Sequence, residues 1–511
     1  MPEVIQPQIN EGDLLAAADI GSNSFHLLVA RYEHGEPRVI DRLRDSVRLA
    51  AGLDEDGNLD ATHHERAMDC LSRFGQRLRG LPPSRIRAVA TNAVRQLSHP
   101  AAFLQPAERA LGHPIEVVSG REEARLIYLG VAHGIPESPE RRLVIDIGGA
   151  STEFIIGQGF EALEKESLQI GCIASTLRFF GDGKLTRKRW KQAQTEIAVE
   201  MQQFVADYRA FGWGETIGSS GTARSIGNVV QAAGWCDSGI SRQALEQLRE
   251  ALLECGTVEN IRLPGLSSDR TPIFAGGVAI LEASFAALGL EHMRVCDTAM
   301  REGLLYDMIG RAEQRDPRTA SITALAQRYA VDRAHAQRVR DTALILFDQV
   351  NGEWNLGPAE RDWIGWAADI HEIGLSIAHS QHHVHGAYIV EKSDLAGFAR
   401  HEQHVLAAIL RCHRRKPDVT ALRMLPERLR QSGLRVTALL RLAVLLQRGR
   451  NTEPLPPLQL RADGKTLSLA LPAMWLATHP LTRADLESER DYLKLLDIKL
   501  QVRESEKLAA A

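Results

Sequence analysis

The sequence predicts an α/β protein with two similar lobes, followed by an all-helical domain and a small α+β domain at the C-terminus. Three observations predict this order. Residues 19–28 and 146–155 are near copies of each other, strands alternate with helices up to about residue 315, and the pattern beyond is almost entirely helical. Strand–helix alternation is typical of α/β domains, and a chain of 511 residues is too long for one hydrophobic core.

The first lobe is expected over residues 1–135. It opens with a meander of three strands near 14–19, 24–31 and 38–43, separated by turn residues. Apolar residues then follow helical or strand spacing in alternation, which predicts a helix at 61–80, a strand at 85–90, a helix at 100–111 and a strand at 115–118.

The second lobe is expected over residues 136–315, because the strand pattern begins again at 143–146 after two prolines. It also contains two stretches rich in glycine and small residues, at 217–222 and 274–279. Both are expected to be loops that bind phosphate, because glycine lets the main chain approach an anion closely.

The helical domain is expected over residues 316–450 and the small α+β domain over residues 451–511. The last domain is expected to contain short strands near 458–460, 467–469 and 498–502, with a helix at 483–496.

Composition predicts an ordinary cytoplasmic protein, with 44% hydrophobic and 25% charged residues and a net charge of −4. The six cysteines lie far apart without a C-x-x-C pair, which indicates reduced thiols. The N-terminus has no basic region followed by an apolar run, so no signal peptide is expected. No stretch reaches the roughly 18 uncharged apolar residues that a membrane-spanning helix needs. The most apolar candidate for such a helix, residues 434–447, contains Arg435 and Arg441 and is expected to be an amphipathic helix.

The two near copies each consist of an apolar strand that ends in aspartate, a Gly/Ser turn and a second apolar strand. Such a turn offers backbone N–H groups to a phosphate, and the aspartates, Asp19 and Asp146, are suited to a hydrated divalent cation. One copy alone would be read as an ordinary hairpin. Two copies predict two lobes that face each other across a phosphate-binding cleft. The residues expected to bind phosphate are Gly21, Ser22, Asn23, Ser24, Gly148, Gly149, Ser151, Gly221 and Thr222.

Two further charged residues are placed at this cleft. Glu153 stands on the strand after the second turn, where it could hold a metal ion or its water. Arg95 follows a strand at the start of a helix, and from there a guanidinium could grip phosphate with two hydrogen bonds. The alternative for Arg95 is a solvent-facing helical arginine.

Glu123 is the candidate general base. Ser119 followed by Glu122 is a capping box, which gives Glu122 a structural role at the start of a helix. Glu123 then shares a helix face with Leu126 and Ile127, so its carboxylate lies on the apolar side. A carboxylate there tends to have a raised pKa and to act as a base. A salt bridge to an unidentified arginine is the structural alternative.

Taken together, these motifs resemble the exopolyphosphatase and guanosine pentaphosphate phosphatase family, which belongs to the superfamily of sugar kinases, heat-shock chaperones and actin. The resemblance covers nearly the whole chain. It is carried by residues 19–24, 119–127, 146–153 and 218–222, and later by 301–303, 371–374 and 393–398.

The resemblance implies two actin-like (ribonuclease H-like) lobes, an HD-like helical domain and Mg²⁺-dependent hydrolysis of terminal phosphoanhydride bonds. Glu123 matches the family's catalytic carboxylate, which orients or deprotonates the attacking water. Asp146 and Glu153 match its metal and phosphate site, and the turn at 19–24 and Arg95 match its phosphate contacts. Ala150 stands where many relatives have a third glycine. The methyl group of alanine still allows the backbone N–H to contact phosphate. The resemblance also implies a homodimer.

His371 and Glu372 occupy the place of the His-Asp pair of HD-type metal-dependent phosphohydrolases. A complete site of that kind needs a histidine upstream and an aspartate downstream. Residues 338–342 contain no histidine, so the domain is expected to have lost its metal. The cluster of His379, His382, His383 and His385 lacks cysteine or carboxylate partners, which disfavours zinc and favours a wall that binds an anion.

Residues 411–450 contain eleven lysines and arginines against two acids. A solvated helical face is one explanation. Nucleic acid is disfavoured, because the stretch has no aromatic residue to stack on bases. We expect the domain to guide a polyphosphate chain. The residues assigned to that role are His379, His383, His385, Arg414, Arg415 and Lys416.

The first choice of function is therefore a processive exopolyphosphatase that releases orthophosphate. The alternative is removal of the 5′-terminal phosphate of guanosine pentaphosphate (pppGpp) to give ppGpp, on the same fold with the same residues. From a different class, the chain could be an actin-like phosphate or nucleotide sensor without turnover, although a binding protein needs no base such as Glu123. No nucleic-acid partner is expected, and weak association with a membrane surface is left open.

Overall fold

The computed structural model describes residues 9–54, 56–136, 138–312, 316–450 and 453–505. The chain divides into two compact units, one formed by Pro7–Arg315 and the other mainly by Asp316–Ala511.

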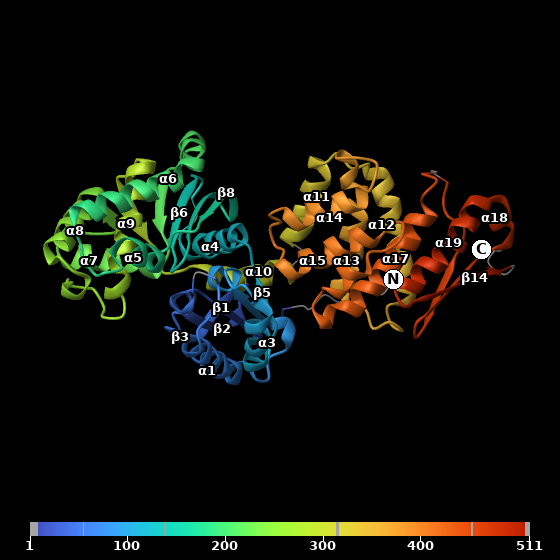
Figure 1. Ribbon diagram of the computed structural model, residues 1–511, viewed down its shortest axis with the longest axis horizontal. Coiled ribbons are helices and arrows are strands. Elements are labelled where there is room, and N and C mark those ends of the chain that lie inside the picture. Colours follow the sequence, from blue (N-terminus) through green and yellow to red (C-terminus); the bar gives the residue numbers. More distant parts are fainter. Residues whose placement is uncertain (1–8, 55, 137, 313–315, 451–452, 506–511) are drawn as a thin grey trace. The chain divides into compact units, whose positions relative to one another are not determined.

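The first unit contains two mixed sheets, of which the first has the strand order β3-β2-β1-β4-β5 (Figure 1). Strands β1 to β3 form an antiparallel meander, whereas β4 and β5 run parallel to β1. The strands are β1 (Leu14–Ile20), β2 (Phe25–Glu33), β3 (Glu36–Asp45), β4 (Ile86–Ala90) and β5 (Ile115–Val117).

The second sheet repeats this topology, with the order β10-β11-β9-β6-β7-β8. Its meander is formed by β6 to β8, and β9 and β11 run parallel to β6. The strands are β6 (Arg142–Ile147), β7 (Thr152–Gln158), β8 (Glu161–Leu168), β9 (Glu215–Gly218), β10 (Ile240–Ser241) and β11 (His292–Val295). The near copies in the sequence thus correspond to β1–β2 and β6–β7, the central hairpins of two equivalent sheets.

The helices of this unit cover both sheets. They are α1 (Ala61–Leu78), α2 (Asn92–Arg95), α3 (Pro100–Leu111), α4 (Gly120–Gly134), α5 (Cys172–Phe180), α6 (Arg187–Phe211), α7 (Gly221–Ala232), α8 (Arg242–Cys255), α9 (Thr271–Leu288) and α10 (Met300–Ala312). Three short 3₁₀ segments accompany them, at Leu49–Gly52, Pro83–Arg85 and Val258–Asn260.

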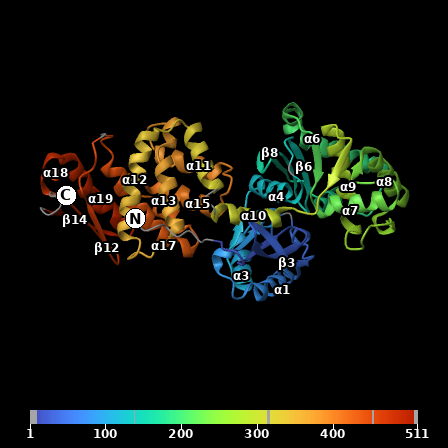
Figure 2. The same ribbon diagram turned by 180° about the vertical axis from the view of Figure 1, so that it is seen from behind.

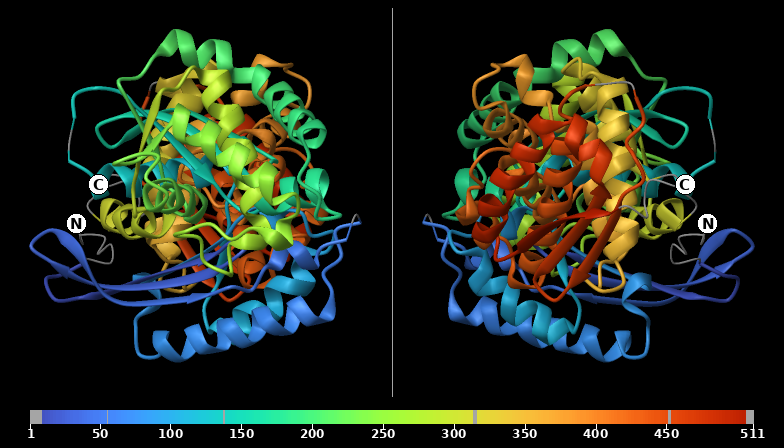
Figure 3. Two further views of the ribbon diagram at one scale, coloured as in Figure 1. Left: turned by 90° about the vertical axis from the view of Figure 1, so that its left-hand side faces the viewer. Right: turned by 90° about the vertical axis from the view of Figure 1, so that its right-hand side faces the viewer.

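Alternation along β1 explains how the helices are arranged. Ala16 and Ala18 point into a core closed by α1 and α3, and Leu15 and Ala17 point into another core formed with α4 and α10. That second core also includes Val144 from the second sheet, so α4 and α10 pack between the two sheets. Figures 1 and 2 show α4 and α10 between the lobes, and Figure 3 shows α1 and α3 together on one side of the first sheet.

Residues 274–279 lie inside α9, so the prediction of a phosphate-binding loop at these residues is wrong. Their glycines allow close helix packing: a Cβ on Gly276 would come within 2.6 Å of Cys172 O on α5, and one on Gly277 within 2.4 Å of Thr222. Helix α9 is also more apolar than 434–447. Among the described helices it is the one long and apolar enough to cross a membrane, and 67% of that window is buried inside the protein.

The second unit is a helical bundle followed by a three-stranded sheet of order β12-β13-β14. Its helices are α11 (Pro317–Arg328), α12 (Arg333–Val350), α13 (Pro358–Ile370), a 3₁₀ segment (Ile373–Ser376), α14 (His382–Lys392), α15 (Arg400–Cys412), α16 (Val419–Arg423), α17 (Glu427–Leu446), α18 (Ala473–Thr478) and α19 (Pro480–Leu495). The strands are β12 (Gln459–Asp463), β13 (Thr466–Pro472) and β14 (Lys499–Ser505). One continuous core runs from Ile322 to Leu500, so the helices and the C-terminal sheet are packed as one body.

Candidate active site

Both Gly/Ser turns line one pocket of about 140 Å³ in the first unit. This volume is below the roughly 300–1,000 Å³ of sites that enclose a whole small ligand, so the pocket suits the end of a larger substrate. Of the residues expected to bind phosphate or metal, those that line it are Asp19, Gly21, Ser22, Asn23, Ser24, Glu123, Asp146, Gly148, Gly149, Ser151, Gly221 and Thr222.

The two turns lie against each other. A Cβ on Gly149 would stand 3.3 Å from the Cβ atoms of both Ser22 and Asn23, which explains why a residue without a side chain fits there. The second turn is fixed by the start of α5, since the N–H groups of Cys172 and Ile173 donate to the carbonyl oxygens of Gly148 and Gly149, each at 2.9 Å. The strands that carry the two turns therefore bring the turns into contact.

The third Gly/Ser loop closes the pocket after β9. Thr222 Oγ1 donates to Ile147 O at 2.9 Å, so this hydroxyl holds the second turn in place. Helix α7 begins at the pocket with Gly221, and free N–H groups at a helix start favour an anion. Gly221 also makes room for an arginine, because a Cβ there would come within 1.9 Å of Arg270 Nη2.

Acidic side chains line the pocket, among them Asp19, Glu123 and Asp146. Burial raises the pKa of Asp19 to about 7, with Arg301 opposing the shift and Glu123 and Asp146 adding to it. Burial also raises the pKa of Asp146 to about 7, although Ser219 Oγ donates to its Oδ2 at 2.9 Å. Carboxylates that are costly to ionise together favour a bound cation in their midst.

Glu153 lies behind these two aspartates. It is buried, outside the described lining of the pocket, and accepts a hydrogen bond from Ser167 Oγ at 2.9 Å. Burial and the neighbouring Glu123 and Asp146 raise its pKa well above the usual value. These causes favour the protonated form of Glu153 in the absence of a cation, and its backbone pairs with that of Asp146 across β6 and β7.

The donor set fits Mg²⁺. Among the described residues, Asp19, Asp146 and Glu153 do not bring three ligand atoms within 4.8 Å of one another, as a closed protein cage would. Mg²⁺ retains several waters and usually binds through one or two carboxylates plus substrate phosphates. Asp19 and Asp146 would supply those carboxylates, and Glu153 could bind a metal-bound water.

Arg95 forms an ion pair with Glu123. It is buried, it does not belong to the described lining of the pocket, and its Nη1 donates to Glu123 Oε2 at 3.0 Å and to Val118 O at 2.8 Å. The salt bridge that the sequence left open for Glu123 is thus realised. Burial raises the pKa of Glu123 and Arg95 opposes that shift, while Arg95 Nη2 is buried without a partner among the described residues.

The arginines that do line the pocket were missed by the sequence analysis. They are Arg44, Arg224, Arg270 and Arg301, from four separate segments. Arg301 Nη1 donates to His26 Nδ1 at 2.9 Å, and burial together with Arg301 lowers the pKa of His26 to about 3, so the ring is neutral and can accept this bond. The run 301–303 carried part of the family resemblance, which was the available signal for Arg301; the other three belong to no local motif.

Of the residues of the second unit that are predicted to guide a polyphosphate chain, four line a common pocket and two do not. His379, Arg414, Arg415 and Lys416 line a larger pocket of about 760 Å³, but His383 and His385 do not belong to its described lining. The pocket wall is formed instead by His335, His371, His382 and His413. The upstream histidine thought to be missing is His335: it lies one helical turn before residues 338–342, on α12, and faces His371.

The comparisons with known proteins agree with this architecture. The model of the Ppx/GppA phosphatase family matches residues 28–312, and that of Ppx/GppA phosphatase domain III matches residues 318–490. A "Guanosine-5'-triphosphate,3'-diphosphate pyrophosphatase" of Aeromonas hydrophila subsp. hydrophila is 38% identical over 482 residues, which cover 94% of this chain and 97% of the relative.

Two solved structures share the fold. An exopolyphosphatase from Cytophaga hutchinsonii aligns with a TM-score of 0.54 at 23% identity, over 58% of this chain and 98% of its own. An exopolyphosphatase-like protein aligns with a TM-score of 0.52 at 24% identity, over 58% of this chain and 99% of its own. The expected actin-like lobes and helical domain are confirmed, and the chain belongs to the Ppx/GppA phosphatase family.

Proposed function

We propose that this phosphatase removes the 5′-terminal phosphate of guanosine pentaphosphate, releasing orthophosphate and leaving guanosine tetraphosphate. The observation that carries the proposal is the 38% identity, over almost the whole of both chains, to a protein named for guanosine-5′-triphosphate,3′-diphosphate. This reverses the order of preference reached from the sequence, where exopolyphosphatase came first.

The geometry of the pocket supports hydrolysis of a terminal phosphoanhydride. Phosphoryl transfer to water needs positioning and neutralisation of charge more than covalent chemistry. The two turns and the start of α7 offer backbone N–H groups to the terminal phosphate, and Arg224, Arg270 and Arg301 offset its charge.

In the proposed reaction Glu123 acts on the attacking water. It lines the pocket, its pKa is raised by burial, and Arg95 holds one of its oxygens. The Thr91 hydroxyl also donates to this carboxylate, and Glu123 would accept a proton from a water directed at the phosphorus. Mg²⁺ at Asp19 and Asp146 would supply positive charge to the phosphate oxygens.

The test is orthophosphate release from pppGpp, from long-chain polyphosphate and from short polyphosphate, each with and without Mg²⁺. We expect kcat/KM for pppGpp to exceed that for polyphosphate per chain end, and activity to depend on Mg²⁺. A higher kcat/KM for long-chain polyphosphate would overturn the proposed substrate. Release from none of them would favour the sensor that binds without turnover.

Polyphosphate is a second candidate substrate, and the basic pocket of the second unit favours it. Six of the eleven basic residues in 411–450 line that pocket: Arg414, Arg415, Lys416, Arg441, Arg448 and Arg450. A polymer of phosphates has the charge to bind there without any base for stacking. Three of the six, Arg441, Arg448 and Arg450, also form ion pairs within the unit, which leaves Arg414, Arg415 and Lys416 as the stronger candidates for polymer binding.

A further inference from the structure

The pocket of the second unit contains an unexpected group of metal-ligating side chains. His335 from α12 meets His371 and Glu372 from the end of α13, and one ligand atom from each lies within 4.8 Å of the other two. Two atoms that bind the same metal at about 2.1 Å stand at most about 4.2 Å apart. A small movement of the side chains would therefore complete a coordination sphere.

The hydrogen bonds of the histidines direct their free nitrogens inward. His371 Nδ1 lies 2.7 Å from Ala368 O, a carbonyl that can only accept, so the proton is on Nδ1 and Nε2 carries a lone pair. This Nε2 is buried and has no partner in the described part of the chain. Metal-binding histidines usually donate the other ring N–H to a carbonyl or carboxylate in this way.

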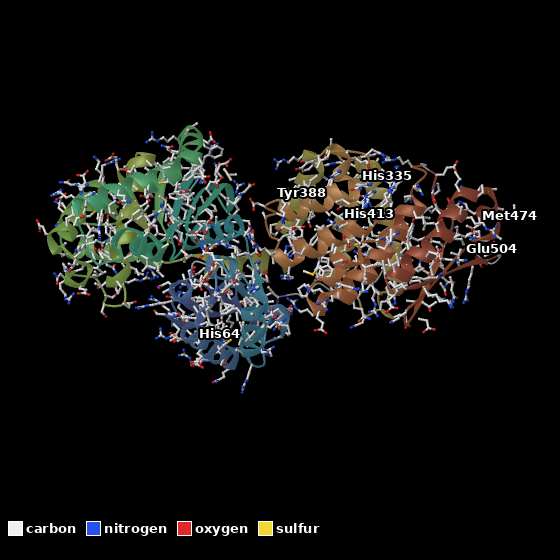
Figure 4. The ribbon with its side chains drawn as sticks, viewed as in Figure 1. His64, His335, Tyr388, His413, Met474 and Glu504 are labelled. Atoms are coloured by element: carbon white, nitrogen blue, oxygen red, sulfur yellow. The ribbon has the colours of Figure 1, made fainter. Side chains whose placement is uncertain are left out.

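His413, at the end of α15, repeats the arrangement. Its Nδ1 lies 2.6 Å from Leu410 O, and its buried Nε2 has no partner among the described residues. The rings of His371 and His413 are 5.7 Å apart, and those of His335 and His371 are 5.5 Å apart. His335 Nδ1 is likewise buried without a partner in the described structure. Figure 4 shows His335 and His413 within the helical bundle.

Such nitrogens destabilise the fold unless something binds them, because a buried polar atom without a partner has lost its hydrogen bonds to water. In both His371 and His413, Nδ1 donates its proton to a backbone carbonyl and the unpartnered Nε2 carries the lone pair that a metal ion would bind.

The charged residues around the histidines indicate which ligand would bind beside a metal ion. Arg414 Nη1 donates to His382 at 3.1 Å, and Arg450 donates to Glu372 at 2.6 Å, so cationic groups stand beside the histidines in the same 760 Å³ pocket. Positive side chains around a metal site disfavour a second cation and favour an anion on the metal.

We propose that His335, His371 and Glu372, with His413 beside them, form a binding site for a divalent first-row transition metal whose open positions face the basic pocket and take a phosphate-bearing anion. Imidazole nitrogens with one carboxylate suit Zn²⁺, Fe²⁺ or Mn²⁺ more than Mg²⁺, which prefers oxygen. The site is distinct in ligand chemistry from the carboxylates of the first unit.

The test uses the full-length protein, stripped with a chelator and titrated with Zn²⁺ in the presence of excess Mg²⁺. We expect one tightly held Zn²⁺ per chain, and at least about tenfold weaker binding in His371→Ala and in the nearly isosteric Glu372→Gln. His385→Ala, a histidine on α14 outside the described pocket lining, is the matched control and should bind as the wild type does. Asp146→Asn should also retain this Zn²⁺, which separates it from metal in the first unit.

Co²⁺ provides a second readout, because its visible absorption reports nitrogen ligands directly. Wild type and His385→Ala should show the band, and His371→Ala should lose it while its melting temperature shows that it is folded. Binding of inorganic phosphate by the Asp146→Asn protein should increase at least tenfold when Zn²⁺ is present. Absence of tightly held metal in wild type, or equal Zn²⁺ affinity in Glu372→Gln, would overturn the metal site; phosphate binding that ignores Zn²⁺ would overturn the anion position.

Discussion

Arg95 Nη1 lies 3.0 Å from Glu123 Oε2, and this ion pair connects a short helix after β4 to the first turn of α4. Both side chains are largely buried, so the pair is held in one geometry and Glu123 presents a fixed oxygen to the pocket. If Glu123 directs the attacking water, Arg95 would act on the substrate through Glu123.

Glu123→Gln should keep the fold and lose most turnover, because the amide keeps the shape and hydrogen bonding but cannot take a proton from water. We expect kcat to fall by about 100-fold or more, with KM little changed. Phosphate release and the melting temperature measure the two effects, and Glu65→Gln, at an exposed position of α1, is the matched control. Near wild-type kcat in Glu123→Gln would remove Glu123 from the mechanism.

Arg95→Gln should lower kcat and move the acidic limb of the pH–rate profile to higher pH. The reason is that Arg95 holds the pKa of Glu123 down against burial, so removing its charge keeps the base protonated at higher pH. KM should change little, since Arg95 is not in the described pocket lining. A large rise in KM, with the acidic limb of the pH–rate profile unchanged, would instead support the contact between Arg95 and phosphate that the sequence predicted.

Gly221→Ala should raise KM, and Arg270→Gln should raise KM in the same way. A methyl group at Gly221 would occupy the place of Arg270 Nη2 and displace this guanidinium from the pocket. Gly310→Ala is the control, because a Cβ there meets nothing within 4 Å and alanine stabilises a helix by up to about 1 kcal/mol over glycine. If Gly221→Ala binds substrate normally, Arg270 is not a phosphate ligand.

Stability of the metal-free protein should fall as the pH rises from about 4 to about 7. Asp19 and Asp146 have a pKa of about 7 when folded against an ordinary value of 3.8, so in this range the folded state binds more protons than the unfolded state. Mg²⁺ should therefore raise the melting temperature more at pH 8 than at pH 5, and Asp146→Asn should reduce the difference. A melting temperature that responds to Mg²⁺ equally at both pH values would contradict a cation between these carboxylates.

Replacing Arg414, Arg415 and Lys416 together by glutamine tests the basic pocket as a polymer guide. If polyphosphate is bound there, kcat/KM should fall more for long chains than for short ones, and the effect should shrink at high salt. Arg423→Gln, an exposed change on α16, is the control. Equal losses on long and short chains would exclude the guiding role.

The sequence by itself determined the two turns, their aspartates and the helix that bears Glu123. Each of these is a local pattern, in which neighbouring residues set the strand, the turn or the cap. The duplication of the pattern was also sufficient to place the turns opposite each other, because equivalent strands occupy equivalent positions in two equivalent sheets.

Only the tertiary structure decided which partners these residues have. Arg95 meets Glu123 across 28 positions, Arg44, Arg224, Arg270 and Arg301 converge from four segments, and His335 reaches His371 from another helix. The glycines at 276 and 277 likewise serve helix packing, although their composition suggested a loop. The physical reason is that a side chain's contacts depend on how elements distant in sequence pack together, and neither residue type nor spacing encodes that packing locally.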